Sequence, residues 1–425
     1  MTSLVACQFE RPRDVEVDAR ELDAPPLECT ASTATCSNDR YTECDASGRY
    51  TRYEVPNGGG VGVPTTLVMH DFACPLGCAA ATRCADPVAA HGVADTMPRW
   101  SDALADVDLT TSAGSVITID TDATGAELEL ADAAGNTFRV PVTVVTQAGG
   151  PELLVLRMRS LTIRGDARII AVGSRALAVA AAFDIVIAGR LDASGVPDAA
   201  GGITSGACVG TAGSTSSGGG GNWDAGGSSS AIDPGGMAQP MEQPLLVGGC
   251  SGGPIAGMAG YAGGAIQLSS RTRISLEEGA IVSVAGGGGR AFATVANFAT
   301  GGGSGGFAYL EAPVVQIANT ARVVGRGGSG AAAKAGQVTV IAQGIDGDAD
   351  LSATTVPEVT CSGCGFGGAG GTSSTPPGRG VDSATGWGGG GGSVGRAVIS
   401  TRTGAVAPPT GTLLLKHTLR TLARH

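Results

Sequence analysis

Two stretches of the chain decide its fold: GGAIQLSSRTRISLEEGAIVSVAGGGG (263–289) and GGFAYLEAPVVQIANTARVVGRGGSG (305–330). Each begins with a glycine pair and continues with an apolar segment that ends in leucine, Leu268 or Leu310. A short polar turn, a second and a third apolar segment, and a glycine run follow. Alternating apolar positions rich in β-branched residues predict short strands. The two stretches are therefore copies of one three-stranded unit, and they align once small gaps are allowed.

The same order recurs in LAVAAAFDIVIAGRLDASG (177–195), and AGQVTVIAQ (335–343) followed by DADLSA gives a reduced copy. Three short strands in about 20–25 residues match one coil of a parallel β-helix, and stacking lets neighbouring coils bury a shared apolar face. We therefore predict a mainly β fold: a parallel β-helix-like solenoid with long glycine-rich loops, preceded by a small disulfide-rich module. We expect inward side chains at Ala178, Ala180, Ile185, Ile187 and Leu191, and outward ones at Asp184, Arg190 and Asp192.

Composition divides the chain into four parts. We interpret residues 1–28 as the end of a lipoprotein signal with a flexible tether, and 29–86 as a cysteine-rich disulfide module. Residues 87–405 would form the solenoid, with an irregular cap at about 100–150 that covers the open sheet edge and coils at about 151–402. In the C-terminal tail, 406–425, Leu415, Leu419 and Leu422 recur at helical spacing, which favours a segment that caps the last coil over one that binds a membrane.

Glycine, with 71 residues, is concentrated in zones at about 195–264, 286–306, 325–330 and 361–395. These zones fall at the same point of the repeat, so we expect loops on one side of the solenoid. The first zone is long for a loop. It is either disordered, which we favour for 210–245, or built from extended polyproline-II-like segments packed against one another.

The last glycine zone ends in GGGGGSVGRAVIST (388–401), where Gly390, Gly392 and Gly395 match the spacing G-x-G-x-x-G. A dinucleotide site requires a helix after the last glycine, whereas the residues from Arg396 onward read as a strand. We interpret the stretch as a turn that uses glycine for positive φ angles. The strand after it would point Val398 inward.

Eleven cysteines indicate an oxidising compartment. Six lie close together without the spacing of a zinc finger, so a disulfide framework is expected, with the pairing left open: Cys29, Cys36, Cys44, Cys74, Cys78 and Cys84. Two further disulfides would join Cys208 to Cys250 and Cys361 to Cys364, with a zinc site of all four thiolates as the alternative.

The segment Leu4-Val5-Ala6-Cys7 resembles a bacterial lipobox, in which the cysteine becomes acylated. We therefore expect lipidation at Cys7 and an exported protein, either an outer membrane-anchored lipoprotein or an extracellular one. The alternative is an ordinary thiol at Cys7. No run of about 18 apolar residues occurs, so contact with a membrane is expected only through the N-terminal lipid.

The net charge of −11 argues against a nucleic-acid partner, which needs a positive surface. Two G-x-S-x-G matches, at 249–253 and 302–306, have no histidine base between residue 100 and the terminal tail, so we predict no catalytic residues and no cofactor. The pattern D-x-D-x-D makes Asp346, Asp348 and Asp350 calcium candidates, with a solvated turn as the alternative.

The spacing C-x6-C-x7-C…C-x3-C-x5-C, the unit GGGSGGFAYLEAPVVQIA and the closing GGGGGSVGRAVIS together resemble a group of proteins. These are the glycine-rich secreted or lipoprotein-like cell-surface proteins of myxobacteria and their relatives. The resemblance covers the chain from Cys29 to about Arg402 and implies a cell-surface location and a β-solenoid. It implies no activity and no catalytic residues.

Two function classes follow from these features. The first is a non-enzymatic, exported structural or adhesin-like interaction protein that presents glycine-rich loops to an envelope or extracellular polysaccharide or protein. The second is a β-helix protein that binds or cleaves a polysaccharide, and cleavage would require carboxylates clustered on one face with arginines. The carboxylates to examine are Asp184, Asp192, Glu277, Glu278 and Glu311.

Overall fold

The computed structural model describes residues 34–37, 40–43, 72–73, 78–80, 83–84, 89–97, 108–132, 135–195, 199–229, 233–240, 245–292, 298–335, 340–353, 355–406 and 412–422. The chain divides into two compact units, Met1–Cys84 and Ala85–His425. Within the described residues, no helix is long and apolar enough to span a membrane.

The first unit contains two small antiparallel sheets. One is formed by β1 (Ala34–Ser37), β2 (Arg40–Glu43) and β3 (Phe72–Ala73), and the other by β4 (Cys78–Ala80) and β5 (Arg83–Cys84). Cys78 and Cys84 are register partners in the second sheet. The predictions for Cys7, Cys29, Cys44 and Cys74 fall outside the described residues, as do the side chains of Cys36, Cys78 and Cys84.

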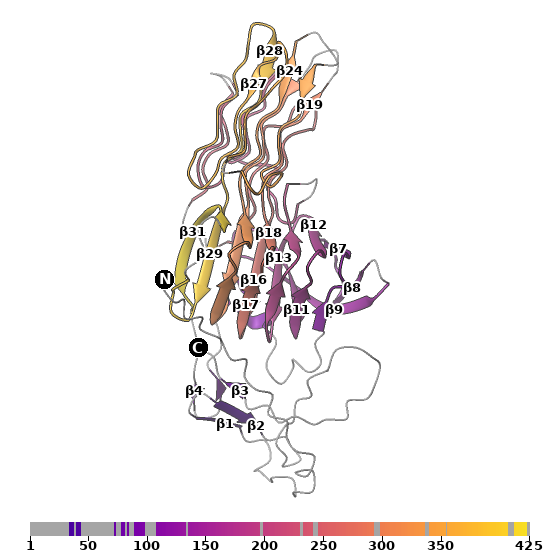
Figure 1. Cartoon of the computed structure of the whole chain (residues 1–425), viewed down its shortest axis with the longest axis vertical. Helices are drawn as coiled ribbons and strands as arrows, with labels where there is room; N and C mark the ends of the chain where they lie inside the picture. The colour runs from indigo at the N-terminus through magenta and orange to yellow at the C-terminus, as the bar shows by residue number, and fades with distance from the viewer. Residues whose placement is uncertain are drawn as a thin grey trace, which may run out of the picture. The chain divides into compact units, whose positions relative to one another are not determined.

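The second unit is mainly β and is organised by three sheets in which most strands run parallel (Figure 1). The eight-stranded sheet contains β8 (Glu127–Ala131), β9 (Thr137–Val145), β10 (Leu153–Met158), β13 (Ala176–Ala181), β16 (Ala265–Ser270), β21 (Phe307–Glu311), β29 (Arg396–Thr401) and β31 (Lys416–Thr421). The five-stranded sheet contains β6 (Asp108–Thr110), β11 (Ser160–Ile163), β14 (Ile185–Ile187), β17 (Arg273–Leu276) and β22 (Val314–Ile317). The six-stranded sheet contains β7 (Val116–Asp120), β12 (Arg168–Val172), β15 (Arg190–Asp192), β18 (Ile281–Ser283), β23 (Arg322–Val324) and β30 (Leu413–Leu414).

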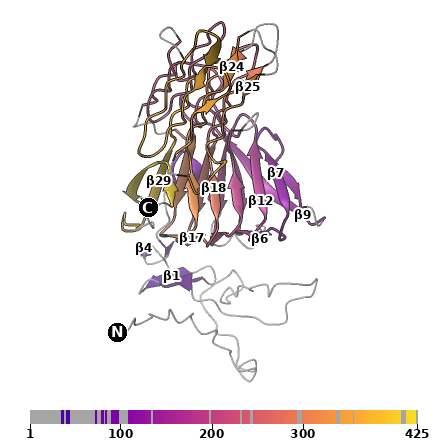
Figure 2. The same ribbon diagram turned by 45° about the horizontal axis from the view of Figure 1, so that its top comes forward.

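The repeated stretches of sequence lie directly beside one another in these sheets. Leu268 of β16 is the register partner of Leu310 of β21, and Val282 of β18 is the partner of Val323 of β23. The earlier copy behaves in the same way, because Val179 of β13 pairs with Leu268. Each copy thus gives one strand to each sheet, and Figure 2 shows successive strands of the sheets side by side.

Along several strands of the eight-stranded sheet, the side chains alternate between two clusters. The main core is shared by all three sheets and includes Ile185, Ile187 and Leu191, which confirms their predicted inward direction. Ala178, Ala180 and Val398 were predicted to point inward, and this is wrong, because they belong to a second cluster on the outer face of the eight-stranded sheet. The period of two along a strand places their neighbours inside the core instead: Leu177, Val179, Ala181, Ala397 and Ile399.

Three sequence predictions about the ends of the repeat need correction. The predicted cap contributes β6 and β7 as regular parallel strands, while only β8 and β9 form an antiparallel edge beside β10. The tail at 413–421 is not a helix: β30 and β31 extend two sheets in parallel register, since the open strand edges of β23 and β29 supply hydrogen-bond partners. The reduced copy at 335–343 contributes β25 (Ile341–Ala342), which pairs antiparallel with β24 (Ala332–Lys334) outside the three sheets.

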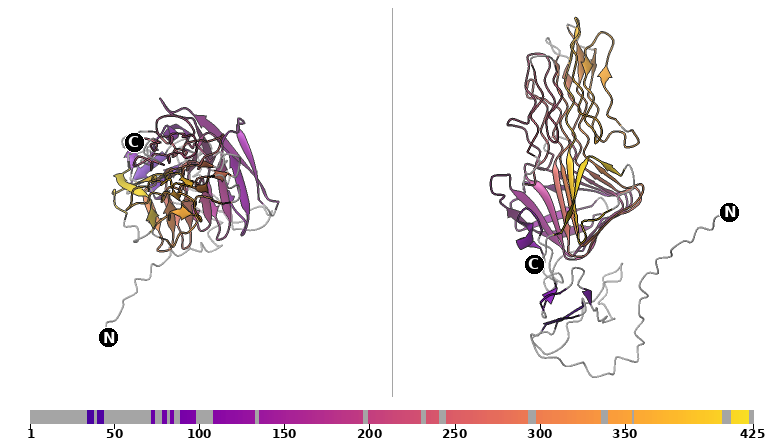
Figure 3. Two further views of the ribbon diagram at one scale, coloured as in Figure 1. Left: turned by 90° about the horizontal axis from the view of Figure 1, so that it is seen from above. Right: turned by 90° about the vertical axis from the view of Figure 1, so that its left-hand side faces the viewer.

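The glycine zones leave the ends of the strands and form a separate bundle of extended segments within the second unit (Figure 3). The bundle contains few strands besides β24 and β25: β19 (Ala291–Phe292), β20 (Phe298–Ala299), β26 (Val359–Thr360), β27 (Phe366–Gly367) and β28 (Gly386–Gly388). Its buried residues are mostly glycine, alanine and serine. The bundle therefore has little of the apolar volume that fills the sheets.

Segment 386–395 crosses the bundle with a hydrogen-bonding period of three. The N–H groups of Gly389 and Gly392 both donate to segment 325–332, those of Gly390 and Ser393 to segment 217–222, and that of Gly391 to Gly378. The carbonyls follow the same period, because Gly389 and Gly392 accept from segment 366–371 while Gly390 and Ser393 accept from segment 301–306. Gly391 accepts from Gly227. A three-residue period without internal hydrogen bonds is the property of a polyproline-II helix, here surrounded by six neighbouring segments.

The bundle needs glycine for close approach. A Cβ atom at Gly391 would overlap the carbonyl oxygen of Ala369, and one at Gly390 would overlap that of Gly227. None of the glycines in 386–395 has a positive φ, so our prediction of a left-handed turn in this stretch is wrong. The missing side chain, and not the range of φ, explains the glycines here.

The preference for disorder at 210–245 is also wrong for the described residues of that range. Gly218, Gly219, Gly220 and Gly221 are buried, and their N–H groups donate to three different segments. The alternative of packed polyproline-II-like segments describes them better. Two disulfides lie in this part of the molecule, Cys208–Cys250 between two segments of the bundle and Cys361–Cys364 between β26 and β27. This is the pairing expected from the sequence, with Cα–Cα distances of 5.8 and 5.1 Å.

Candidate functional site

The outer face of the eight-stranded sheet is only partly covered. A short segment at 89–97, which contains the 3₁₀ helix η2 (Val93–Thr96), packs against β10 and β13. Ala89, Val93 and Met97 of this segment meet the small and apolar side chains that β10 and β13 present on that face. The neighbouring strands β21, β29 and β31 are left with a pocket above them.

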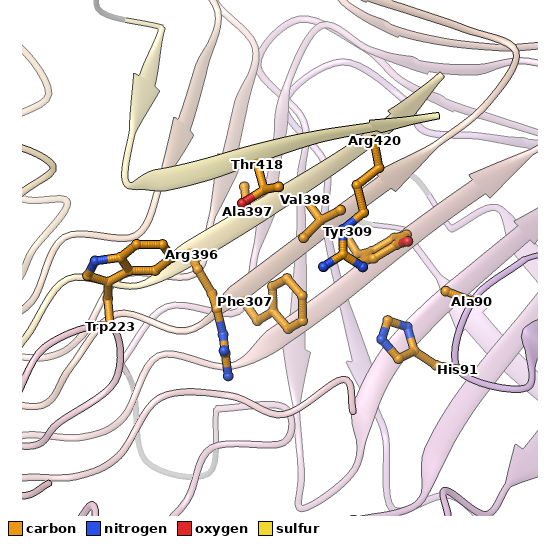
Figure 4. Close-up of a pocket in the computed structure, with 10 residues that line it drawn as sticks. All are labelled: Ala90, His91, Trp223, Phe307, Tyr309, Arg396, Ala397, Val398, Thr418 and Arg420. Atoms are coloured by element: carbon orange, nitrogen blue, oxygen red, sulfur yellow. The ribbon is translucent and has the colours of Figure 1, made fainter. Parts of the chain in front are cut away.

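The pocket has a volume of about 210 Å³ and is lined mainly by these three strands (Figure 4). Its remaining wall comes from segment 89–97 and from the glycine bundle. The lining residues are Ala90, His91, Trp223, Phe307, Tyr309, Arg396, Ala397, Val398, Thr418 and Arg420.

Strand register determines which side chains meet in the pocket. Phe307 is opposite Arg396, and Tyr309 is opposite Val398, which in turn is opposite Thr418. On β16, which is the neighbour of β21 on the side away from the pocket, the register partners of Phe307 and Tyr309 are Ala265 and Gln267. Small side chains thus allow segment 89–97 to cover one part of the face, and large aromatic ones form the floor of the pocket beside it.

The aromatic side chains have fixed relative positions. The His91 and Tyr309 rings meet edge to face, with centroids 4.9 Å apart and an interplanar angle of 84°. The centroids of Phe307 and Tyr309 are 6.0 Å apart at 72°. Such edge-to-face pairs are favourable because the positive edge of one ring meets the negative face of the other. Phe307 and Tyr309 are also largely buried.

Trp223 reaches the pocket from the junction between the bundle and the sheets. Its backbone N–H donates to the carbonyl of Val394, and the next N–H, of Asp224, donates to the Ser393 hydroxyl. Arg396 begins β29 two residues after Val394. The residues at 393–396 therefore position both Trp223 and Arg396, and link the glycine bundle to the pocket.

His91 holds segment 89–97 to the sheet. Its backbone is left-handed, with φ of 58°, and its Nδ1 is 2.7 Å from Oε1 of Gln267. Because the amide nitrogen of Gln267 donates to Glu311, Oε1 is the acceptor and Nδ1 carries the proton. Burial lowers the pKa of His91. The imidazole is thus neutral at pH 7, with Nε2 left as an acceptor.

Glu311 is two residues after Tyr309 on the same face of β21, where it is fully enclosed under segment 89–97. Its carboxylate accepts hydrogen bonds from the Ala90 N–H, the Ser269 hydroxyl and the Gln267 amide. Burial raises the pKa of Glu311 to about 7, and the hydrogen bonds oppose this rise. These contacts fix segment 89–97 to the sheet, and the carboxyl group does not line the pocket.

The calcium candidates are not brought together. Asp346 accepts from the Gly288 N–H, Asp348 pairs with Arg190 and Asp350 caps Ser352. The carbonyls of Gly347 and Asp350 instead accept hydrogen bonds from the buried guanidinium of Arg326, which supplies the positive charge in this loop. Within the described residues, no group of three or more His, Cys, Asp or Glu could hold a metal ion.

The five carboxylates considered for a catalytic groove are each engaged by their own neighbours. Asp184 pairs with Arg273 beside the five-stranded sheet, and Asp192 pairs with Arg168 and Arg190 in the six-stranded sheet. Glu277 accepts from Ser275, and Glu278 accepts from Thr320. Glu311 is enclosed between the eight-stranded sheet and segment 89–97. Each carboxylate therefore has its own local structural partner.

No family model, no curated protein and no solved structure matches this chain. The pocket must therefore be interpreted from its own residues. The sequence analysis missed these residues. The one indication of the pocket in the sequence was the pair Phe307 and Tyr309. These two aromatic residues are two positions apart, and so on the same face of one predicted strand, in a chain that is only 4% aromatic.

Proposed function

We propose that this chain is an exported, non-enzymatic β-solenoid that binds a saccharide residue in the pocket over β21, β29 and β31. The observation that carries the proposal is the aromatic floor and wall formed by Phe307, Tyr309 and Trp223 on the outer face of a sheet. Phe307 and Tyr309 belong to the second cluster on this face and not to the main core, whereas the half-buried Trp223 also packs against the main core. Large aromatic side chains with a few polar groups at the rim are typical of binding sites for small molecules.

The solenoid interpretation is supported by the repeated strand order. Each copy of the unit contributes one parallel strand to each of three sheets, and successive copies lie in register. The export interpretation is supported by the disulfides Cys208–Cys250 and Cys361–Cys364, because disulfides persist in oxidising compartments.

A saccharide suits the pocket for two reasons. A sugar ring has apolar C–H faces that pack on aromatic rings, while its hydroxyl groups lie around the edge and can reach polar groups at the rim. His91 offers Nε2 as an acceptor, and the Thr418 hydroxyl can both donate and accept. The volume of about 210 Å³ is below the ~300–1,000 Å³ of sites for drug-sized ligands, so the pocket fits a single ring.

Binding is favoured over cleavage by the composition of the lining. Glycoside hydrolysis generally uses two carboxyl groups that flank the scissile bond. The described residues that line the pocket contain no carboxylate, and the nearby Glu311 is engaged by Ala90, Gln267 and Ser269. The glycine bundle then serves as a rigid support that fixes Trp223 against the sheet.

The proposal is tested by binding measurements on the intact chain. We expect the purified protein to bind a subset of saccharides on a glycan array without releasing products. Replacing Trp223 with Ala removes one aromatic wall, and we expect about tenfold weaker binding of the selected saccharide in calorimetric titration. Phe366→Ala, which removes an aromatic residue that is 46% exposed outside the pocket, is the matched control and should leave the affinity unchanged. A wild-type protein that binds no saccharide would contradict the proposal.

A further inference from the structure

The two arginines of the pocket have different environments. The guanidinium of Arg396 is buried, lies 5.1 Å from the centroid of the Phe307 ring, and donates to the Pro240 carbonyl and the Gln239 side chain. These contacts hold Arg396 in place as part of the wall. Arg420 is exposed at the rim, and its side chain extends from β31 toward Tyr309 (Figure 4).

The guanidinium of Arg420 has no hydrogen bond or ion pair with any residue in the described part of the chain. Several other arginines on the sheets are paired with carboxylates, as Arg168 and Arg190 are with Asp192. An arginine fork presents several donors in a plane and suits a carboxylate. Arg420 is thus a cation available at the rim of a site that otherwise suits a sugar ring.

The charge of the lining contrasts with the charge of the whole chain. The chain carries a net charge of −11, yet the charged groups that line the pocket are Arg396 and Arg420, and the lining also contains the neutral His91 of segment 89–97. Glu311, two residues after Tyr309 on the same strand, accepts hydrogen bonds from Ala90, Gln267 and Ser269 and does not line the pocket. A locally positive pocket on an acidic protein is complementary to an anionic ligand.

We propose, on the basis of the saccharide-binding function above, that the pocket selects acidic sugars, in which a ring carboxylate pairs with Arg420 while the ring lies on Phe307 and Tyr309. Arg420 is two residues beyond Thr418 along β31, which corresponds to about 7 Å of strand. This separation places the cation at the edge of a ring held above Tyr309, where the carboxylate of a uronic acid lies. The hydroxyl groups of the ring would then face Thr418 and His91.

The test compares two probes that differ in one group, methyl β-glucuronide and methyl β-glucoside. In calorimetric titration of the full chain at pH 7 and low salt, we expect at least tenfold tighter binding of the glucuronide, because hydrogen bonds to charged groups are stronger than neutral ones. Raising the ionic strength should reduce this preference. Equal affinity for both probes would overturn the acidic preference and leave the saccharide-binding function intact. Binding of neither probe, together with an empty glycan array, would overturn both proposals.

Two variants separate a direct role of Arg420 from a general effect of charge. Arg420→Ala should bring the ratio of glucuronide to glucoside affinity close to one, whereas Arg420→Lys should retain part of the preference. Arg164→Ala removes the same charge from an exposed turn between β11 and β12 and should leave the ratio at its wild-type value. A preference that survives Arg420→Ala, or that Arg164→Ala removes equally, would overturn the assignment.

Discussion

The three sheets and the glycine bundle of this protein are stabilised in opposite ways. The sheets enclose a core of leucine, isoleucine and valine side chains. Within each sheet, a strand forms its backbone hydrogen bonds with the strands next to it. In the bundle, one central segment donates and accepts hydrogen bonds toward six neighbours, and the backbones touch one another. Side chains hold the first region together and their absence allows the second to form. An added methyl group should therefore destabilise the bundle, and the removal of methyl groups should destabilise the sheets.

The largest effect is expected from an added methyl group at the centre of the bundle. In Gly391→Ala the new Cβ overlaps the Ala369 carbonyl, so the segments must separate and the hydrogen bonds of Gly391 to Gly378 and Gly227 weaken. We expect a loss of about 4 kcal/mol in the free energy of unfolding, measured by urea denaturation. Gly165→Ala is the control, because nothing lies within 4 Å of its added Cβ and its φ is not positive. Equal urea midpoints for the two variants would refute the close-packed bundle.

The complementary change removes methyl groups from the sheet core. Leu310 of β21 is fully buried, and Leu310→Ala leaves a cavity among the three sheets. We expect a loss of about 3 kcal/mol in the free energy of unfolding. Leu419→Ala makes the same truncation on β31, where the side chain is 37% exposed, and should cost about 1 kcal/mol or less. If Leu310→Ala were as mild as Leu419→Ala, the sheets would not depend on side-chain packing as we describe.

The disulfide Cys208–Cys250 should stabilise the protein by a similar free energy, because it restricts the unfolded chain. Cys208 and Cys250 are 42 residues apart, whereas Cys361 and Cys364 are only 3 apart. A longer closed loop restricts the unfolded state more, so Cys208→Ala with Cys250→Ala should lower the unfolding free energy by about 3 kcal/mol. The pair Cys361→Ala with Cys364→Ala should cost less than about 2 kcal/mol. The double variant at Cys208 and Cys250 should therefore melt at a lower temperature than the double variant at Cys361 and Cys364, and the reverse order would contradict this expectation.

The smallest effect concerns the contact between the sheet and segment 89–97. The pKa of Glu311 is raised to about 7 by burial, so the folded state binds its proton more tightly than the unfolded state does. The stabilising contribution of the protonated group is therefore complete at low pH and is lost as the pH rises through 7. Relative to Glu311→Gln, the wild type should lose about 2 kcal/mol of stability between pH 5.5 and 8. His91 contributes equally to the pH dependence of both proteins, so its opposite effect cancels when the stability of Glu311→Gln is subtracted from that of the wild type. If the unfolding free energies of the two proteins ran parallel with pH, the prediction would be contradicted.

The regular part of the fold could be predicted from the sequence because strand periodicity is local. The stretches 263–289 and 305–330 show their common unit without any reference to structure, and their strands pair as neighbours. The direction of Ala178 and Val398 could not be obtained in this way. Both faces of the eight-stranded sheet are covered in places, so an apolar residue is compatible with either face.

The pocket was less accessible to sequence analysis, because its residues come from parts of the chain far apart in sequence. His91 and Trp223 reach Tyr309 and Arg396 only after three strands have aligned and the bundle has formed. Their types are unremarkable taken singly. What makes them a candidate site is that the strand register places Phe307 and Tyr309 side by side with Arg396 and Val398 at one edge of segment 89–97.

The sequence by itself determined a chain of repeated three-stranded units separated by glycine zones, because period-two patterns and glycine content depend only on neighbouring residues. Only the tertiary structure decided what the glycines do. The stretch GGGGG at 388–392 is compatible with a turn, a disordered loop or a packed segment until other backbones approach it. A glycine segment has no side chains with which to select its partners, so its conformation is fixed by the hydrogen bonds that its six neighbours provide.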